Sequence, residues 1–199
     1  MTSIFDSALE LVASVWIYPL VFASVVLDAF FPAFPSETIV VGLAAHAPST
    51  GAPDALLLAL VAASAAVVGD NVAFAFGRWT RGRQLSWMTR PRIEGAMAWA
   101  RRQLDNRPVT ILLTSRYIPF GRTVVTISAG ASGFPWRRYA PLSVVSGALW
   151  ATYLVSIGWL AGAWMQDNPL LGTVIAILAA MGMGFAFEWL TRVFTAAAN

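Results

Sequence analysis

Five charged side chains lie in or at the edge of apolar stretches of this sequence: Asp28, Glu37, Asp70, Arg116 and Arg122. One unpaired charge near the centre of a membrane helix costs about 2.5–3.5 kcal/mol on insertion scales. Five unpaired charges would therefore cost on the order of 10 kcal/mol or more, which is comparable to the stability of a whole domain. These side chains must pair with one another, bind a proton or face a wet cavity, and three acids with two arginines allow nearly balanced pairing.

Two of these charges occupy matching positions in two proline-broken apolar segments. Glu37 follows Pro35, and Arg122 follows Pro119. In both segments the charge is followed by threonine, a β-branched residue and valine, and then by sequence rich in glycine and alanine. Interrupted hydrophobic segments in corresponding positions of two halves are typical of transporters built from inverted repeats.

The composition predicts an all-α integral membrane protein that forms a single domain over residues 1–199. The chain is 58% hydrophobic and 12% charged, with a mean hydropathy of +0.67, whereas a soluble domain has about 25% charged residues. The sequence has no cysteine, so a disulfide framework is excluded, and His46 is its single histidine. A dedicated metal site is not expected, and no cofactor is expected either.

The apolar segments predict about four transmembrane helices and two re-entrant helical hairpins. A spanning helix needs about 20 mostly apolar residues, and such segments lie at about 8–30, 54–77, 139–164 and 170–191. The proline-broken segments at about 31–48 and 108–131 are too short between their breaks to span, which favours hairpins. We expect the first segment to be a retained helix, since Asp6 and Glu10 replace the basic region of a signal peptide.

The arginines predict the orientation in the membrane. Eight of the thirteen lie between Arg78 and Arg107, and the loops at 46–54 and 165–169 contain none. The positive-inside rule then places 78–107 and both termini in the cytoplasm, so the two hairpins enter from opposite faces. The cytoplasmic segment at about 84–107 has helical spacing of apolar residues from Pro91 to Leu104. It is interpreted as an interfacial amphipathic helix that contacts anionic headgroups, with a solvated linker helix as the alternative.

Helices that begin at the two breaks would present free N–H groups near the middle of the membrane, where an anion can bind. We expect Arg116 and Arg122, with the hydroxyl groups of Thr123 and Ser36, to bind a phosphate headgroup. Asp28, Glu37 and Asp70 are candidates for proton coupling or ion pairing, because a partly buried carboxylate can exchange a proton. For Asp70, a purely structural ion pair remains the alternative.

Several motifs resemble those of the bacterial DedA family, which is related to the eukaryotic VTT-domain scramblases. The acid–proline–proline–acid stretch 27–37, the Gly-Asp and Gly-Arg pairs within 69–78, and the stretches 116–123 and 129–139 carry the resemblance, which covers roughly residues 25–160. Two departures are mild: Asp28 stands where glutamate followed by asparagine is usual, and Phe120 replaces a small residue.

The resemblance implies transport of lipids across the bacterial cytoplasmic membrane. It implies undecaprenyl phosphate as the lipid carried, or phospholipids such as phosphatidylethanolamine. The functional acids and arginines of the family correspond to Asp28, Glu37, Arg116 and Arg122. The expected partners are the bilayer and an anionic lipid, with no nucleic acid, and a homo-oligomer is an open alternative to a monomer.

Three alternatives remain to polyprenyl-phosphate transport, which we expect to be proton-coupled. A phospholipid flippase or scramblase and a proton-coupled small-ion antiporter belong to the same broad class, and a non-transporting scaffold belongs to another. An enzyme is not expected. Ser115-Arg116 resembles the start of an acid-phosphatase motif, but that motif requires a nucleophilic histidine six residues after the arginine, where this chain has Arg122.

Overall fold

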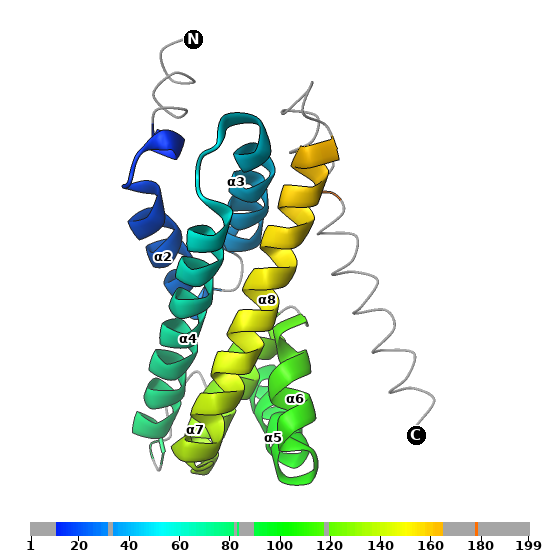
Figure 1. The fold of residues 1–199 in the computed structure, drawn as a ribbon. Coiled ribbons are helices and arrows are strands. Elements are labelled where there is room, and N and C mark those ends of the chain that lie inside the picture. Colours follow the sequence, from blue (N-terminus) through cyan, green and yellow to red (C-terminus); the bar gives the residue numbers. More distant parts are fainter. Residues whose placement is uncertain are drawn as a thin grey trace.

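The computed structural model describes residues 11–31, 34–81, 83, 90–117, 120–164 and 178. Within these ranges the chain is helical and contains no strand, which confirms the all-α prediction. Figure 1 shows the helices in order of sequence: α2 (Ile17–Asp28), α3 (Ser36–Thr50), α4 (Ala55–Trp79), α5 (Pro91–Asn106), α6 (Pro108–Thr114), the 3-10 turn η1 (Ser115–Tyr117), α7 (Gly121–Ser132) and α8 (Trp136–Trp164).

Two long helices, α4 and α8, pack against each other, and α2, α3, α6 and α7 pack against this pair. They contain 25 and 29 residues and are long and apolar enough to cross a membrane. At 1.5 Å per residue they measure about 38 and about 44 Å. They correspond to the predicted spans at 54–77 and 139–164, whereas the predicted span at 170–191 lies, except for residue 178, outside the described residues.

The start of α4 is fixed by a side-chain cap. Asp54 Oδ1 accepts a hydrogen bond of 2.7 Å from the backbone N–H of Leu57, which satisfies one of the free donors of the first turn. We expect Asp54→Ala to lower the free energy of unfolding by about 1 kcal/mol, measured by thermal unfolding in detergent. Asp54→Ser keeps a cap and is expected to lose only a fraction of that. Equal losses for the two variants would contradict this role.

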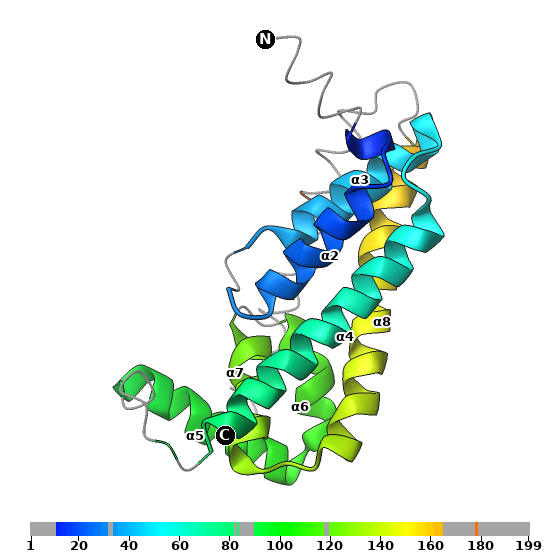
Figure 2. The same cartoon turned by 90° about the vertical axis from the view of Figure 1, so that its left-hand side faces the viewer.

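Two helical hairpins lie beside this central pair. Helices α2 and α3 run side by side, and the end of α2 at Asp28 and the start of α3 at Ser36 both lie about halfway along α4, while α6 and α7 lie next to the other half (Figure 2). In the second hairpin, η1 ends at Tyr117 and α7 begins at Gly121, inside the predicted hairpin segment 108–131, and Phe120 before α7 has a positive φ of 61°.

The first hairpin differs from its prediction in extent. Residues 36–50 form one helix that continues through Pro48, so the break lies before Ser36, at the start of the predicted segment 31–48 instead of near its middle. Helix α2 is its other arm and has 12 residues, fewer than the predicted span of 8–30 requires. Most of this difference lies at the start of the helix, because residues 14–16 form a turn and α2 begins only at Ile17. Pro35 instead marks the start of α3, since proline lacks an N–H and restricts the residue before it. Entry of either hairpin into a membrane stays a prediction.

The two halves exchange contacts. Helix α3 packs against α8 and α7 packs against α4, so the second arm of each hairpin contacts the long helix of the other half. Glycines allow both contacts: a Cβ at Gly77 would overlap the carbonyl of Ile127 in α7, and a Cβ at Gly162 would overlap the carbonyl of Ala45 in α3. This exchange agrees with the repeat that the two broken segments indicate.

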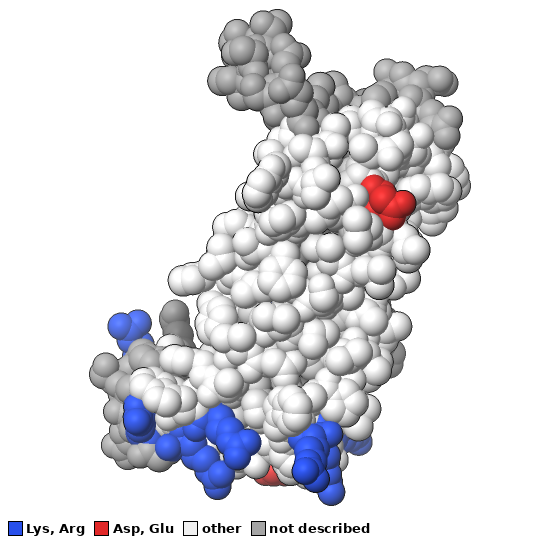
Figure 3. Space-filling model, turned by 60° about the vertical axis from the view of Figure 1, so that its left-hand side comes forward, with Lys and Arg blue, Asp and Glu red and all other residues white. Residues whose placement is uncertain are grey.

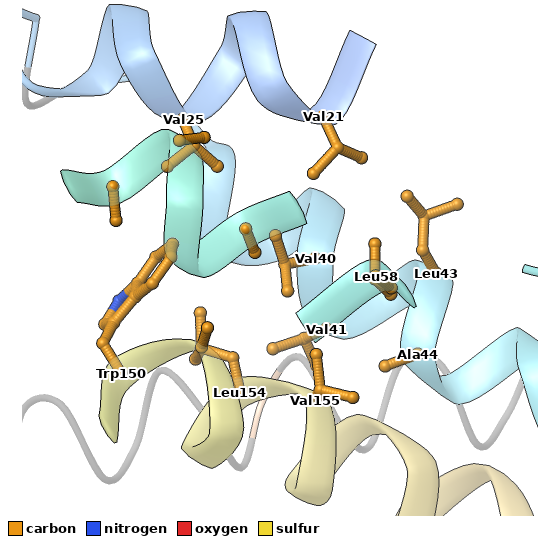
Figure 4. Close-up of a cluster of buried hydrophobic side chains, with 14 of the residues drawn as sticks. Val21, Val25, Val40, Val41, Leu43, Ala44, Leu58, Trp150, Leu154 and Val155 are labelled. Carbon is orange, nitrogen blue, oxygen red and sulfur yellow. The ribbon is translucent and has the colours of Figure 1, made fainter. Parts of the chain in front are cut away.

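Two apolar cores lie at opposite ends of the molecule, and the charged residues lie between them. One core joins α2, α3, α4 and α8 through residues that include Val21, Val40, Leu58 and Leu154 (Figure 4). The other lies among α4, α5, α6, α7 and α8, and its buried residues include Phe74, Ala100, Leu104, Val125 and Tyr139. Asp70 in α4 and Arg122 in α7 therefore lie in the region between the two cores.

The described part of the predicted amphipathic segment forms α5. Residues 84–89 of that segment lie outside the described part. Its buried residues Met97, Ala100 and Leu104 recur at helical spacing. Ala100 and Leu104 belong to the second core, and α5 packs against α7. The apolar side of α5 therefore covers protein, and only its other side is free to contact headgroups.

Exposed arginines gather at one end of the molecule, which we call the arginine end (Figure 3). The described ones are Arg78, Arg81, Arg83, Arg90, Arg101, Arg102, Arg107, Arg137 and Arg138. The described chain begins, at residue 11, at the opposite end (Figure 1). The physical reason is that α2 turns back with α3 instead of crossing. Residues 1–10 and 179–199 lie outside the described part, so the prediction that both termini are cytoplasmic stays untested.

Candidate functional site

Asp70 lies at the centre of a buried charged cluster. It is in the middle of α4 and is 4% exposed. Its Oδ2 accepts a hydrogen bond of 2.8 Å from Arg116 Nη1, and its Oδ1 accepts one of 2.5 Å from Arg122 Nε. One carboxylate therefore partners two guanidinium groups, which are supplied by η1 and α7.

Arg122 connects Asp70 to a second carboxylate. Its Nη1 lies 3.0 Å from Asp28 Oδ2, at the C-terminal end of α2. Thr123 adds a neighbouring link, because its hydroxyl donates a hydrogen bond of 3.0 Å to the carbonyl of Ala29. The first turn of α7 is thus tied to the end of α2, and the cluster joins the two hairpins at their reversals. Gly69 permits the close approach of α2, since a Cβ there would lie 2.9 Å from Ala29 Cβ.

Arg116 has hydrogen-bonding capacity to spare. Its side chain is 2% exposed, and one nitrogen pairs with Asp70. Its guanidinium carbon lies 4.7 Å from the centroid of a Trp150 ring, within the range of a cation–π contact. Nε and Nη2 are buried and have no hydrogen-bond partner within the described residues. Buried donors are costly to leave unpaired, so these two groups are available to an incoming acceptor.

Glu37 lies at the edge of the cluster instead of in it. It is in the first turn of α3, is exposed, and accepts a hydrogen bond of 3.3 Å from Trp150 Nε1. The salt bridges found among the described residues involve Asp28 and Asp70 as the acids. Trp150 therefore stands between Glu37 and Arg116, with its N–H on the acid and its ring face on the base.

The predicted site residues separate into two groups. Asp28, Asp70, Arg116 and Arg122 form one connected network. Glu37, Thr123 and Ser36 lie around it, and the Ser36 hydroxyl is fully buried. Their roles in binding phosphate or in proton coupling stay predictions.

Two residues of the site, Trp150 and Tyr139, were not among the predicted site residues. The Tyr139 hydroxyl donates toward the backbone carbonyl of Asp70 at 3.3 Å and lies 3.2 Å from Thr126 Oγ1. Both belong to a predicted spanning helix, where an aromatic residue normally indicates only apolar surroundings or the membrane interface. Their spacing of eleven residues, which places them on one side of α8, is the signal that could have found them.

A small cavity adjoins the cluster. It has room for about one water molecule. Its lining consists of Asp70, Leu112, Ser115, Arg116, Arg122, Thr126, Tyr139, Ser143 and Ser146. A phosphate group does not fit this volume, so headgroup binding requires the helices around the cluster to separate. The arginine donors favour an anion over a metal ion, and the described residues contain no group of three or more histidine or acidic side chains placed to hold a metal.

We expect two substitutions of Trp150 to differ in their cost. Trp150→Phe keeps a ring beside Arg116 but removes the N–H bonded to Glu37, which costs about 1 kcal/mol of stability. Trp150→Leu also removes the ring and leaves a larger void, so we expect it to cost clearly more than Trp150→Phe. Thermal unfolding of the purified variants measures both. Equal destabilisation by phenylalanine and leucine would show that the ring contact with Arg116 contributes nothing.

Comparison with known proteins finds one family and several relatives. Residues 31–160 match the VTT domain. YghB, an inner membrane protein of Escherichia coli, is 27% identical over 148 residues, which are 72% of this chain and 67% of YghB. The inner membrane protein YqjA of the same organism is 31% identical over 137 residues, 67% of this chain and 60% of YqjA. YohD, also an E. coli inner membrane protein, is 25% identical and covers 78% of this chain and 81% of YohD. No solved structure matches the chain.

Proposed function

Because the chain belongs to the VTT-domain family, which includes the DedA proteins, we propose that it moves an anionic lipid across the bacterial inner membrane. The proposed substrate is undecaprenyl phosphate, and the proposed site is the cluster of Asp28, Asp70, Arg116 and Arg122. The observation that carries the proposal is the unpaired N–H edge of buried Arg116 inside a cluster that joins the two hairpins.

The surface of the helices supports a position in the membrane. Large apolar side chains are exposed along three of them, among them Leu20 and Leu27 of α2, Leu60 and Val72 of α4, and Leu149 of α8. Soluble proteins rarely expose apolar surface so continuously. The names of the relatives give the inner membrane as their location, and the arginine end would face the cytoplasm. The two hairpins would then be re-entrant and would reach the cluster from opposite faces.

A phosphate-bearing lipid matches the chemistry of the cluster. Guanidinium groups bind phosphate oxygens through paired N–H donors, and Arg116 offers Nε and Nη2 without breaking an existing bond. The polyprenyl tail would remain in the bilayer beside the hairpins while only the headgroup enters. Thr123 and Ser36, on the two hairpins, would supply hydroxyl groups to the phosphate.

Replacement of an aspartate by phosphate as the partner of an arginine gives a mechanism for the proposed proton coupling. The two arginines and two aspartates together carry no net charge, and each arginine is bonded to at least one aspartate. A phosphate that takes over the arginine donors would leave Asp70 or Asp28 without a partner in a poorly hydrated site. A carboxylate in that position takes up a proton, because burial disfavours its charged form. Release of the phosphate on the other side would reverse the exchange.

Transport of candidate lipids in proteoliposomes tests the substrate. We expect undecaprenyl phosphate to move between leaflets faster than phosphatidylethanolamine, and we expect collapse of the pH gradient to slow it. Movement of phosphatidylethanolamine alone would favour the alternative of a phospholipid flippase or scramblase. Rates that are unchanged without a pH gradient or membrane potential would remove proton coupling but leave transport itself in place.

One observation keeps a small-ion antiporter as the second candidate. The cavity beside Arg116 has room for about one water molecule, which suits a small ion better than a lipid headgroup. In an antiporter, ion flux would proceed in liposomes that lack any polyprenyl phosphate. A non-transporting scaffold would instead show neither ion flux nor lipid movement.

A further inference from the structure

The inward side of α8 changes from polar to apolar at Trp150. Tyr139, Ser143 and Ser146 precede it at helical spacing, and they are 2%, 4% and 6% exposed. After Trp150 the buried side continues with Leu154 and Val155. Residues spaced by three and four positions lie on one face of a helix. One stripe of α8 is therefore polar between the arginine end and the cluster and apolar beyond the cluster.

Hydrogen bonds connect the polar part of this stripe to the arginine end. Trp136, the first residue of α8, is 51% exposed, and its Nε1 donates to Asn71 Oδ1 at 2.9 Å. Asn71 in turn donates to Ser143 Oγ at 3.3 Å. Ser143 lines the cavity beside Asp70. A continuous series of polar groups thus leads from the exposed start of α8 to the buried cluster.

The cavity has the properties of a hydrated site. Five hydroxyl-bearing residues line it: Ser115, Thr126, Tyr139, Ser143 and Ser146. Arg116 also lines it, with two buried N–H groups that have no partner among the described residues. Polar cavities with at least two such partners hold water, whereas apolar cavities of this size stay dry. A single water molecule there would accept from Arg116 and bond to the surrounding hydroxyl groups.

The opposite approach to the cluster is closed by apolar side chains. Val21 and Val25 from α2, Val40 from α3, Leu58 from α4 and Leu154 from α8 fill this side (Figure 4). Each of them is at most 2% exposed. The hydroxyl-lined cavity therefore connects Asp70 to the arginine end, whereas the links from the cluster to Asp28 and Glu37 run through the side chains of Arg122 and Trp150.

We propose that this hydroxyl-lined cavity binds water and forms a one-sided path for water and protons between the arginine end and Asp70. Its use in transport rests on the proposed function, but its hydration does not. The charged and titratable groups around Asp70 are Arg116 from η1, Arg122 from α7 and Tyr139 from α8. Asp28 from α2 is connected through Arg122, and Glu37 from α3 through Trp150.

The absence of cysteine from the chain makes this path directly testable. Ser143→Cys and Ser146→Cys each introduce one thiol on the proposed path. Ser24→Cys is the matched control, because Ser24 is similarly buried, at 7% exposed, but lies on α2 beside the apolar core. Silver ion, a charged thiol reagent no larger than a water molecule and therefore able to enter a cavity of this size, is applied from one side at a time, to right-side-out and to inside-out vesicles. Such reagents require a hydrated thiolate, which an apolar site disfavours.

We expect both path variants to react at least tenfold faster than Ser24→Cys, and only when the reagent is applied from the side of the arginine end. Reaction rates equal to that of Ser24→Cys, or equal rates from both sides, would overturn the proposal. The two variants lie on different turns of α8, so one folded variant is sufficient for the test. Labelling that persists in protein without lipid transport would contradict the proposed function and leave the path intact.

Discussion

Arg122→Ala is expected to abolish lipid translocation and to lower the free energy of unfolding by about 3–5 kcal/mol, the usual cost of breaking a buried ion pair. The arginine contacts Asp28 and Asp70. Without it Asp28 loses the salt bridge that the structure shows, and Asp70 keeps only Arg116. Thermal unfolding in detergent measures the stability, and leaflet-resolved transport in proteoliposomes measures the function.

Two further variants separate charge from geometry at this position. Arg122→Lys keeps the positive charge but cannot reach both carboxylates with a planar fork, so we expect it to regain part of the stability and little of the transport. In the double variant Asp28→Ala with Arg122→Ala, the carboxylate that lost its partner is gone. We therefore expect less destabilisation than the sum of the single effects. Wild-type stability of Arg122→Ala would show that the ion pairs do not hold the hairpins together.

Gly77→Ala and Gly130→Ala are expected to prevent α4 and α7 from packing and to cost more than about 3 kcal/mol, at the upper end of overpacking effects. A Cβ at Gly77 would overlap the carbonyl of Ile127, and one at Gly130 would overlap the carbonyl of Phe74. Both obstacles are backbone atoms of a neighbouring helix, which no rotamer change can move. Yield of monodisperse protein and its unfolding temperature measure the effect.

The same substitution at Gly95 is the control. Gly95 lies in α5, and a Cβ there would meet nothing within 4 Å. Alanine is favoured over glycine in a helix interior by about 1 kcal/mol, so Gly95→Ala should leave the protein unchanged or slightly more stable. If all three variants behaved alike, the close approach of α4 and α7 at Gly77 and Gly130 would not contribute to stability.

The cost of buried charge was sufficient to find the cluster from the sequence, but not to find its pairing. Of the five charges that had to pair, bind a proton or face a wet cavity, four form one ion-pair network. Which acid faces which arginine depends on how closely the helices approach, and small residues such as Gly69 and Gly130 decide this. The sequence pattern made Glu37 the counterpart of Arg122. The structure instead places it at the edge of the cluster, bonded to Trp150.

The helical segments were predictable where apolar length alone decides them. The long helices α4 and α8 fall at the predicted positions. The first segment was misjudged in length, because an apolar arm of a hairpin and a spanning helix have the same composition. Tyr139 and the serines of α8 could not be predicted as site residues either. The sequence of a spanning helix does not show which of its sides packs against other helices and which side faces lipid.

The most direct test of the central claim is the rate at which undecaprenyl phosphate moves between the leaflets of proteoliposomes that contain wild-type protein or Arg116→Ala. Undecaprenol, which has the same tail and no phosphate, serves as the matched lipid control. We expect wild-type protein to accelerate only the phosphate lipid, and we expect Arg116→Ala to reduce that acceleration at least tenfold while the protein remains folded. Equal transport by wild type and Arg116→Ala, or equal movement of both lipids, would contradict a phosphate-binding role for the cluster of Asp28, Asp70, Arg116 and Arg122.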